Sequence, residues 1–84
     1  MYNIYGKYRG RLTQSIIDRY INLEKLDAAF NSKITNVNHL TKLEILDAFG
    51  INCGINDAGL VQCVNLKSLN VSYNRKITEG RITT

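Results

Sequence analysis

No apolar run in the 84-residue sequence approaches the roughly 18 residues that would indicate a membrane-spanning helix. The basic N-terminal segment YNIYGKYRGRL lacks the apolar stretch of a secretory signal. We therefore expect no membrane association and an intracellular, cytoplasmic location, with the nucleus as the alternative. A hydrophobic content of 44% and a charged content of 21% are typical of a globular chain. These values predict one small domain over residues 1–84.

Cysteine and histidine are both scarce. Cys53 and Cys63 are too far apart for a CxxC pair, and His39 is the only histidine that could join them in a metal site. Metal, redox and cofactor sites are therefore not expected, and two ordinary reduced thiols are the favoured interpretation. The formal charge of +4 comes from lysines and arginines spread along the chain without a nucleic-acid motif, so nucleic acid is an unlikely partner.

One short motif occurs twice, as NSKIT at residues 31–35 and NRKIT at 74–78. The residues before it match as well, because LEKLDAAFN (23–31) and LKSLNVSYN (66–74) share leucines at the first and fourth places and asparagine at the last. LEILDAFGIN (43–52) is a third copy whose asparagine comes one place late, which predicts one extra residue in its turn. The copies begin roughly twenty residues apart, a period typical of solenoid proteins.

Each interval between the copies begins with an aliphatic residue followed by a polar residue suited to capping a helix. Apolar positions then continue to the next leucine, in LTQSIIDRYIN, ITNVNHLTK and INDAGLVQCVN. Short helices or 3₁₀ turns are expected here, and the second interval is the least helical. The repeats are assigned to residues 12–33, 34–54 and 55–76.

These residues resemble a leucine-rich repeat, with the pattern L-x-x-L-x-L-x-x-N/C-x-L, over roughly residues 12–78. Residues 54–80, GINDAGLVQCVNLKSLNVSYNRKITEG, are similar to the cysteine-containing subclass found in F-box adaptors. The resemblance implies an α/β fold: a solenoid with a short parallel sheet on its concave face and short helices or 3₁₀ turns on its convex face. Ala28 and Ala48 depart from the pattern by replacing a leucine, and Ile51 stands where asparagine or cysteine is expected.

The spacing predicts a core of stacked leucines, because these side chains can be buried only if neighbouring coils close the sides. The expected columns are Leu23, Leu43 and Leu66, and next to them Leu26, Leu46 and Leu69. Asn31, Asn52 and Asn74 would lie where the chain leaves each strand, so their predicted role is to satisfy loop backbone groups.

Side chains between the leucines should point to the concave face, since strand side chains alternate. The candidate partner-binding columns are Lys25, Ile45 and Ser68; Asp27, Asp47 and Asn70; and Ala29, Phe49 and Ser72. A partial strand YNIYG would add Asn3 to the second column and Tyr5 to the third. Phe49, an outward aromatic beside acidic residues, is typical of a binding hot spot. The alternative is that Phe49 covers Ala29 and shields the sheet.

Charged residues give two further hypotheses. Asp27 and Asp47 would be about 5 Å apart at the backbone, close enough to share a proton or a cation. No histidine, serine–base pair or glycine-rich loop converges on them, and His39 belongs to the convex side, so an enzyme is not expected. A basic rim is expected in the turns after the strands, formed by Lys7, Arg9, Arg11, Lys33, Arg75 and Lys76. It would serve as a solvated edge or steer an acidic partner.

Two functions remain. The first is a protein–protein interaction module that recognises a protein partner on the concave face. The alternative is a structural or self-assembling protein, a homo-oligomer or filament, that associates through uncapped solenoid ends. F-box adaptors use their repeats to select substrates, but no F-box is present in this chain.

Overall fold

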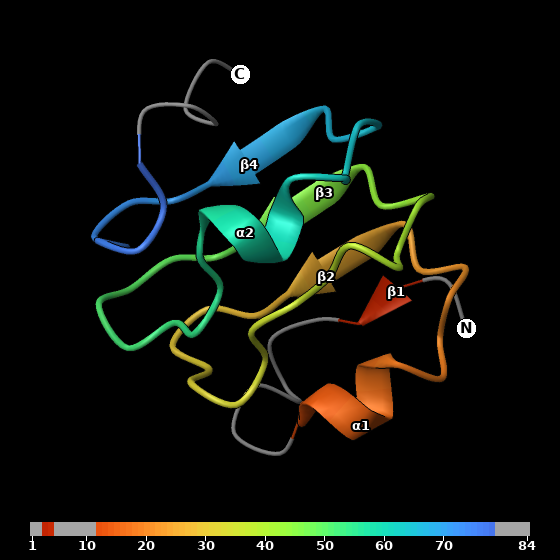
Figure 1. The fold of residues 1–84 in the computed structure, drawn as a ribbon, viewed down its shortest axis with the longest axis horizontal. Helices are drawn as coiled ribbons and strands as arrows, with labels where there is room; N and C mark the ends of the chain where they lie inside the picture. Colours follow the sequence, from red (N-terminus) through yellow and green to blue (C-terminus); the bar gives the residue numbers. More distant parts are fainter. Residues whose placement is uncertain (1–2, 5–11, 79–84) are drawn as a thin grey trace.

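The computed structural model describes residues 3–4 and 12–78, and Figure 1 shows their arrangement. In chain order the elements are β1 (Asn3–Ile4), α1 (Gln14–Ile17), β2 (Lys25–Asp27), β3 (Ile45–Asp47), α2 (Asp57–Leu60) and β4 (Ser68–Asn70). In this part of the chain the strands form one parallel sheet in the order β1-β2-β3-β4. The predicted combination of a short parallel sheet with short helices is confirmed. No helix among the described residues is long and apolar enough to cross a membrane.

The register of β2, β3 and β4 agrees with the predicted columns. Leu46 pairs with Leu26 on one side and with Leu69 on the other, so the strand centres stack directly. The register of β1 was predicted wrongly, because Asn3 pairs with Lys25 of the first column and Ile4 pairs with Leu26. A two-residue strand with one aliphatic residue fits either inward position of its neighbour, so its sequence could not fix the register. Tyr5 lies outside the described residues.

The core lies between the sheet and the connections that carry the helices. Leu23, Leu26, Leu43 and Leu46 are buried, as the column prediction required. Their counterparts at β4 are Leu66, Leu69 and Val71, which are only partly buried. From the connections, the apolar residues that close the core are Ile17, Ile34, Val37, Leu40, Ile55, Leu60, Cys63 and Ile77. The core is therefore densest around β2 and β3 and thins toward β4.

The connections repeat one pattern of turns. Successive backbone bonds run three residues back, from Tyr20 to Ile17 (3.1 Å) and from Leu23 to Tyr20 (3.0 Å). The same pair of bonds joins Val37, Leu40 and Leu43 and, further on, Leu60, Cys63 and Leu66. Each connection thus advances in 3₁₀-type turns that place every third side chain inward. Cys63 occupies the place of Leu40, which explains why a small apolar thiol is buried there.

Two of the connections begin with a capped helical turn. The side-chain oxygens of Thr13 and Asn56 accept hydrogen bonds from Ile16 and Gly59 at the starts of α1 and α2. Residues 28–44, all described, contain no helix, as expected for the second interval. Gly59 is required in α2 because a Cβ there would collide with the carbonyl oxygen of Thr35.

The asparagine positions are structural at two of the three sites. The Asn31 amide donates to the Leu12 carbonyl at 2.9 Å, and the Asn74 amide donates to Ala48 at 2.9 Å. The side-chain oxygens of both asparagines accept hydrogen bonds from the backbone N–H groups two and three residues further along the chain. The prediction for Asn52 is wrong, because Asn52 is exposed and the buried Cys53 takes its place, with Sγ 3.5 Å from the Ala28 oxygen.

The middle turn differs because it carries two extra residues, rather than the one predicted. Cys53 follows Ala48 by five positions, whereas Asn31 follows Ala28 by three. The backbone bonds that close the turns are nevertheless alike, from Asn31 to Ala28 (3.1 Å) and from Cys53 to Gly50 (3.1 Å). The extra residues include Ile51, which is exposed.

Candidate functional site

The open face of the sheet, opposite the helix-bearing connections, carries the predicted binding columns. Ile45 is exposed between Lys25, which is half-buried, and Ser68, which is exposed. The second column, Asp27, Asp47 and Asn70, lies beside the first in register. The structure therefore brings these candidate residues together on one surface.

The second column also has a structural task. Oδ1 of Asp27 accepts a hydrogen bond from the Ala29 backbone N–H at 3.0 Å. Asp47 accepts from Phe49 and Asn70 from Ser72 with the same geometry and distance. An amide oxygen replaces a carboxylate in the third case, so the bond requires an acceptor and not a charge. These residues close the strand ends whether or not a partner is bound.

Three aromatic side chains form a continuous row where the strands end, here called the aromatic ridge: Phe30, Phe49 and Tyr73. The Phe49 ring packs edge-to-face against Phe30 at 5.1 Å and against Tyr73 at 5.5 Å between ring centroids. Phe49 itself is half-buried, but Phe30 is 54% exposed and Tyr73 is 78% exposed. The ridge therefore presents a wide apolar surface to solvent beside the open face. Of the other residues of the third column, Ser72 is exposed as predicted. The prediction that Ala29 lies on the binding surface is wrong, because Ala29 is buried.

Sequence reasoning identified Phe49 but missed Phe30 and Tyr73. Both precede the turn asparagine at the same place in LEKLDAAFN and LKSLNVSYN, and that repeated aromatic was the available signal. Alternation along a strand could not reveal it, because these residues have left the strand and adopt positive φ, 61° for Phe30 and 62° for Tyr73. A left-handed conformation costs a bulky residue about 1–2 kcal/mol.

Gly50 occupies the equivalent place in the middle turn, with φ 109°. A Cβ at Gly50 would lie 2.8 Å from Cδ1 of Phe30, so the absent side chain leaves room for that ring. The ridge residues together with Gly50, Ile51 and Arg75 line an open hollow of about 330 Å³. Gly50, which departs from the pattern of the other two repeats, therefore leaves room for a ring of the aromatic ridge.

Basic residues lie in the turns that follow the ridge. Lys33, Arg75 and Lys76 are all exposed, and the Lys76 ammonium donates to the Cys53 carbonyl at 3.2 Å. The other members of the predicted rim, Lys7, Arg9 and Arg11, lie outside the described residues. The ridge is therefore situated between the acidic column of the sheet and basic turns.

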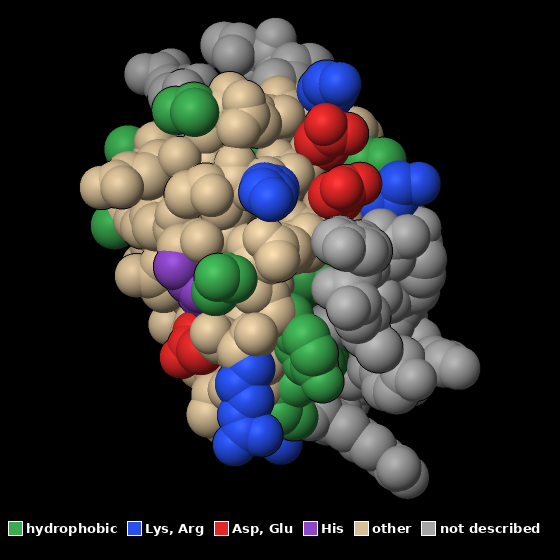
Figure 2. Space-filling view, turned by 90° about the vertical axis from the view of Figure 1, so that its right-hand side faces the viewer, with side chains coloured by type: hydrophobic (Ala, Val, Ile, Leu, Met, Phe, Trp, Pro, Cys, Tyr) green, Lys and Arg blue, Asp and Glu red, His purple; other side chains and the backbone are tan. Residues whose placement is uncertain are grey.

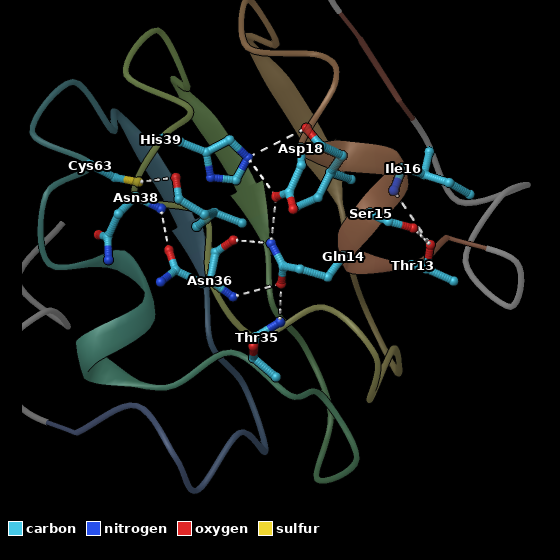
Figure 3. Close-up of polar contacts among 12 residues, drawn as sticks. Thr13, Gln14, Ser15, Ile16, Asp18, Thr35, Asn36, Asn38, His39 and Cys63 are labelled. Atoms are coloured by element: carbon cyan, nitrogen blue, oxygen red, sulfur yellow. Dashed lines mark hydrogen bonds and ion pairs between the residues drawn. The ribbon is translucent and has the colours of Figure 1, made fainter.

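A cluster of polar side chains lies around α1, on the side of the molecule opposite the open face of the sheet (Figure 3). The Gln14 amide donates to the Asn36 carbonyl at 2.7 Å, and its oxygen accepts from the backbone N–H groups of Thr35 and Asn36. His39 Nε2 lies 3.1 Å from Asp18, and the residues around them border a shallow hollow of about 560 Å³. The polar atoms of Gln14 are already bonded within the protein, so this cluster ties α1 to the next connection.

At the end of the molecule where the strands begin, acidic and basic side chains lie close together, as Figure 2 shows. Glu24, Lys42, Glu44 and Lys67 border a hollow of about 420 Å³ there, and Lys67 lies 3.5 Å from Glu44. The lining of this hollow contains only polar and charged residues of both signs, which is typical of a solvated surface.

The cysteines are buried, and each Sγ lies close to a backbone carbonyl, Cys63 at 3.1 Å from Val37. Burial raises the pKa of the Cys53 thiol, while a backbone hydrogen bond to Ile55 and the nearby Lys76 oppose the rise. Among the described residues, no group of three His, Cys, Asp or Glu side chains is placed to hold a metal ion.

No protein-family model, curated protein or solved structure matches the chain. Function is therefore inferred from the geometry of the described residues. The aromatic ridge is the most distinctive part of that geometry, since it combines exposed rings, positive φ and a hollow.

Proposed function

We propose that the chain is a short leucine-rich repeat solenoid whose concave face is the open face of the sheet. Support comes from bonds that recur from repeat to repeat. The Glu24 carbonyl accepts hydrogen bonds from the N–H groups of Glu44 and Ile45, at the start of β3, at 2.8 and 3.0 Å. The Glu44 carbonyl accepts from Lys67 and Ser68, at the start of β4, at the same two distances. Cys53 at the turn position of Asn31 and Asn74 agrees with the N/C alternative of the repeat pattern.

The proposed function is recognition of a protein partner on this face, without a catalytic step. The observation that carries the proposal is the aromatic ridge. Interface hot spots are enriched in aromatic residues that desolvate on binding, and Phe49 has the central position between two exposed rings. The column of Lys25, Ile45 and Ser68 would add contacts farther along the same face, and Asp27 and Asp47 would act mainly on association rate and its salt dependence.

A phage-displayed library of random peptides, selected on the immobilised full chain, tests this function even though the partner is unidentified. Selected peptides should bind Phe49→Ala more weakly by over about 1 kcal/mol, roughly a fivefold loss of affinity. Val64→Ala is the matched control, since Val64 is 79% exposed and does not line the hollow beside the ridge. It should leave binding unchanged.

Thermal unfolding of the same variants separates binding from packing. If Phe49 is an anchor, Phe49→Ala should unfold close to the temperature of the parent. Equal losses of stability and affinity would make Phe49 a packing residue, and peptides that bind parent and variant alike would refute the proposed site.

A second candidate function, self-assembly through the solenoid ends, is favoured by the residues around β4. Leu66, Leu69 and Val71 are partly exposed, whereas the equivalent Leu43, Leu46 and Ala48 are buried by the next repeat. A further strand placed against β4 would bury this apolar edge in the same way.

A further inference from the structure

The ridge aromatics occupy backbone positions that ordinarily favour glycine. The strand register aligns Phe30, Gly50 and Tyr73, and all have positive φ. Only the middle repeat uses glycine, although glycine is the residue without steric cost there. Core packing does not account for the aromatic choices, because both rings are more than half exposed. A strained and exposed aromatic pair is better explained by a ligand that covers the rings.

The hollow beside the ridge sets the kind of group that fits. Its volume of about 330 Å³ is bordered by the rings, by Gly50 and by the aliphatic side chain of Ile51, so its walls are mainly apolar. This volume is at the lower end of the range for ligand pockets, and the hollow is open to solvent, so it suits one bulky side chain.

Charge identifies what should flank that side chain. Arg75 borders the hollow, and among the described residues no ion pair joins it or Lys33 to an acid. Asp27 and Asp47 lie on the sheet side of the ridge, where they would repel an anion. A carboxylate can therefore approach only from the turn side, toward Arg75, where a guanidinium can bind it through two parallel hydrogen bonds.

We propose that the ridge binds an extended peptide segment of another protein, in which a bulky apolar side chain is flanked by acidic residues. The apolar side chain enters the hollow, and a neighbouring carboxylate forms an ion pair with Arg75. The positive charges of Lys33 and Lys76 attract the acidic residues at longer range. This inference rests on the proposed function and specifies the class of its partner.

The test uses three synthetic peptides, blocked at both ends, titrated into the isotope-labelled full chain and followed by NMR. GGEFEGG should shift the amides of residues 30, 49–51, 73 and 75. GGKFKGG, with reversed charge, and GGEAEGG, without the ring, should bind at least about tenfold more weakly.

Arg75→Glu should reverse the preference, so that GGKFKGG binds more tightly than GGEFEGG. Arg19→Glu is the matched control, because it changes the net charge equally but lies in the exposed turn after α1. It should preserve the order of the parent. Retention of the acidic preference in Arg75→Glu would overturn the assignment of Arg75.

Tyr73→Gly separates ligand binding from packing. Glycine relieves the left-handed backbone, so the melting temperature should equal or exceed that of the parent while GGEFEGG binds at least about fivefold more weakly. A lower melting temperature with unchanged affinity would make the ring structural.

The outcomes distinguish this inference from the function on which it rests. Equal binding of GGEFEGG and GGKFKGG, or no shift at the ridge up to about 5 mM peptide, overturns the acidic-peptide inference. Phage-selected peptides that still depend on Phe49 would then preserve the broader proposal of a protein-binding module. Shifts confined to the β4 strand would instead indicate pairing of peptide with the sheet edge and would also overturn the ridge site.

Discussion

Asn74 is buried, and its side chain is fully engaged with the backbone of two segments. Its amide donates to Ala48 (2.9 Å) and Ile55 (3.3 Å), and its oxygen accepts from Lys76 (2.8 Å) and Ile77 (3.3 Å). Asn74→Ala should destabilise the protein by at least about 1–3 kcal/mol, because buried backbone groups lose their partners. Chemical denaturation monitored by circular dichroism measures the change.

Asn52→Ala provides the matched control for this change. Asn52 is exposed, so its loss should alter stability by less than about 0.5 kcal/mol. Similar effects of the two substitutions would contradict the assignment of Cys53, rather than Asn52, to the turn position.

Cys53 gives a prediction about pH. Its thiol has a raised pKa in the folded chain, whereas the unfolded chain has an ordinary value of about 8.5. Above that pH the unfolded state loses a proton that the folded state retains, so the contribution of Cys53 to stability is lost as pH rises through the folded pKa. The free energy of unfolding should therefore fall more steeply with pH, above about 8.5, in the parent than in Cys53→Ser. If the free energy of unfolding depended on pH in the same way in the parent and in Cys53→Ser, burial would not raise the pKa of this thiol.

The residue scale also shows where sequence reasoning stopped. The leucines could be placed because each apolar position recurs with the repeat, and burial leaves few alternatives. Phe30 and Tyr73 could not be placed by strand alternation, since their direction is set by positive φ after the strand. The role of Cys53 was hidden by two inserted residues, which put Asn52 one place before the buried turn position.

At the scale of elements, β3 is the centre of the sheet. Leu46 is 1% exposed and has a leucine on each side, whereas Leu69 of β4 is half-buried with a neighbour on one side. Leu46→Ala should cost about 2–5 kcal/mol. Since a small domain has only a few kcal/mol of stability, this variant should be largely unfolded.

Leu69→Ala is the comparison that makes the test specific to the centre of the sheet. It removes the same atoms from a partly exposed site, so it should cost clearly less and leave a cooperative melt. A Leu46→Ala melt close to that of the parent would remove Leu46 from the centre of the core.

Strand positions and register were predictable for β2, β3 and β4 because three copies of one pattern had to stack in the same way. The register of β1 was not, since a two-residue strand contains too little pattern. Helix starts at Thr13 and Asn56 followed from capping residues, but Gly59 depends on a contact with Thr35 that only the packed repeats create.

At the scale of the whole molecule, the β4 edge of the sheet differs from the centre in its backbone hydrogen bonds. Each strand offers backbone N–H groups to the next: Ala48 donates to Asn70 at 2.8 Å and Gly50 to Ser72 at 2.9 Å. The equivalent groups of β4 are the N–H groups of Val71 and Tyr73, which donate to no acceptor among the described residues. Backbone donors and partly exposed leucines therefore coincide at this edge.

This edge predicts association between copies of the chain, through like edges in a closed dimer or head-to-tail in an open filament. Sedimentation from micromolar to millimolar concentration should show a rising mass. Amide exchange should be fast for Val71 and Tyr73 in dilute protein and should slow as the mass rises, while Ala48 and Gly50 remain protected throughout because their bonds lie within one chain. A constant monomeric mass, with Val71 and Tyr73 as protected as Ala48 and Gly50, would mean that the chain covers its own edge. Self-assembly would then be refuted, and recognition of a separate protein at the aromatic ridge would remain as the proposed function.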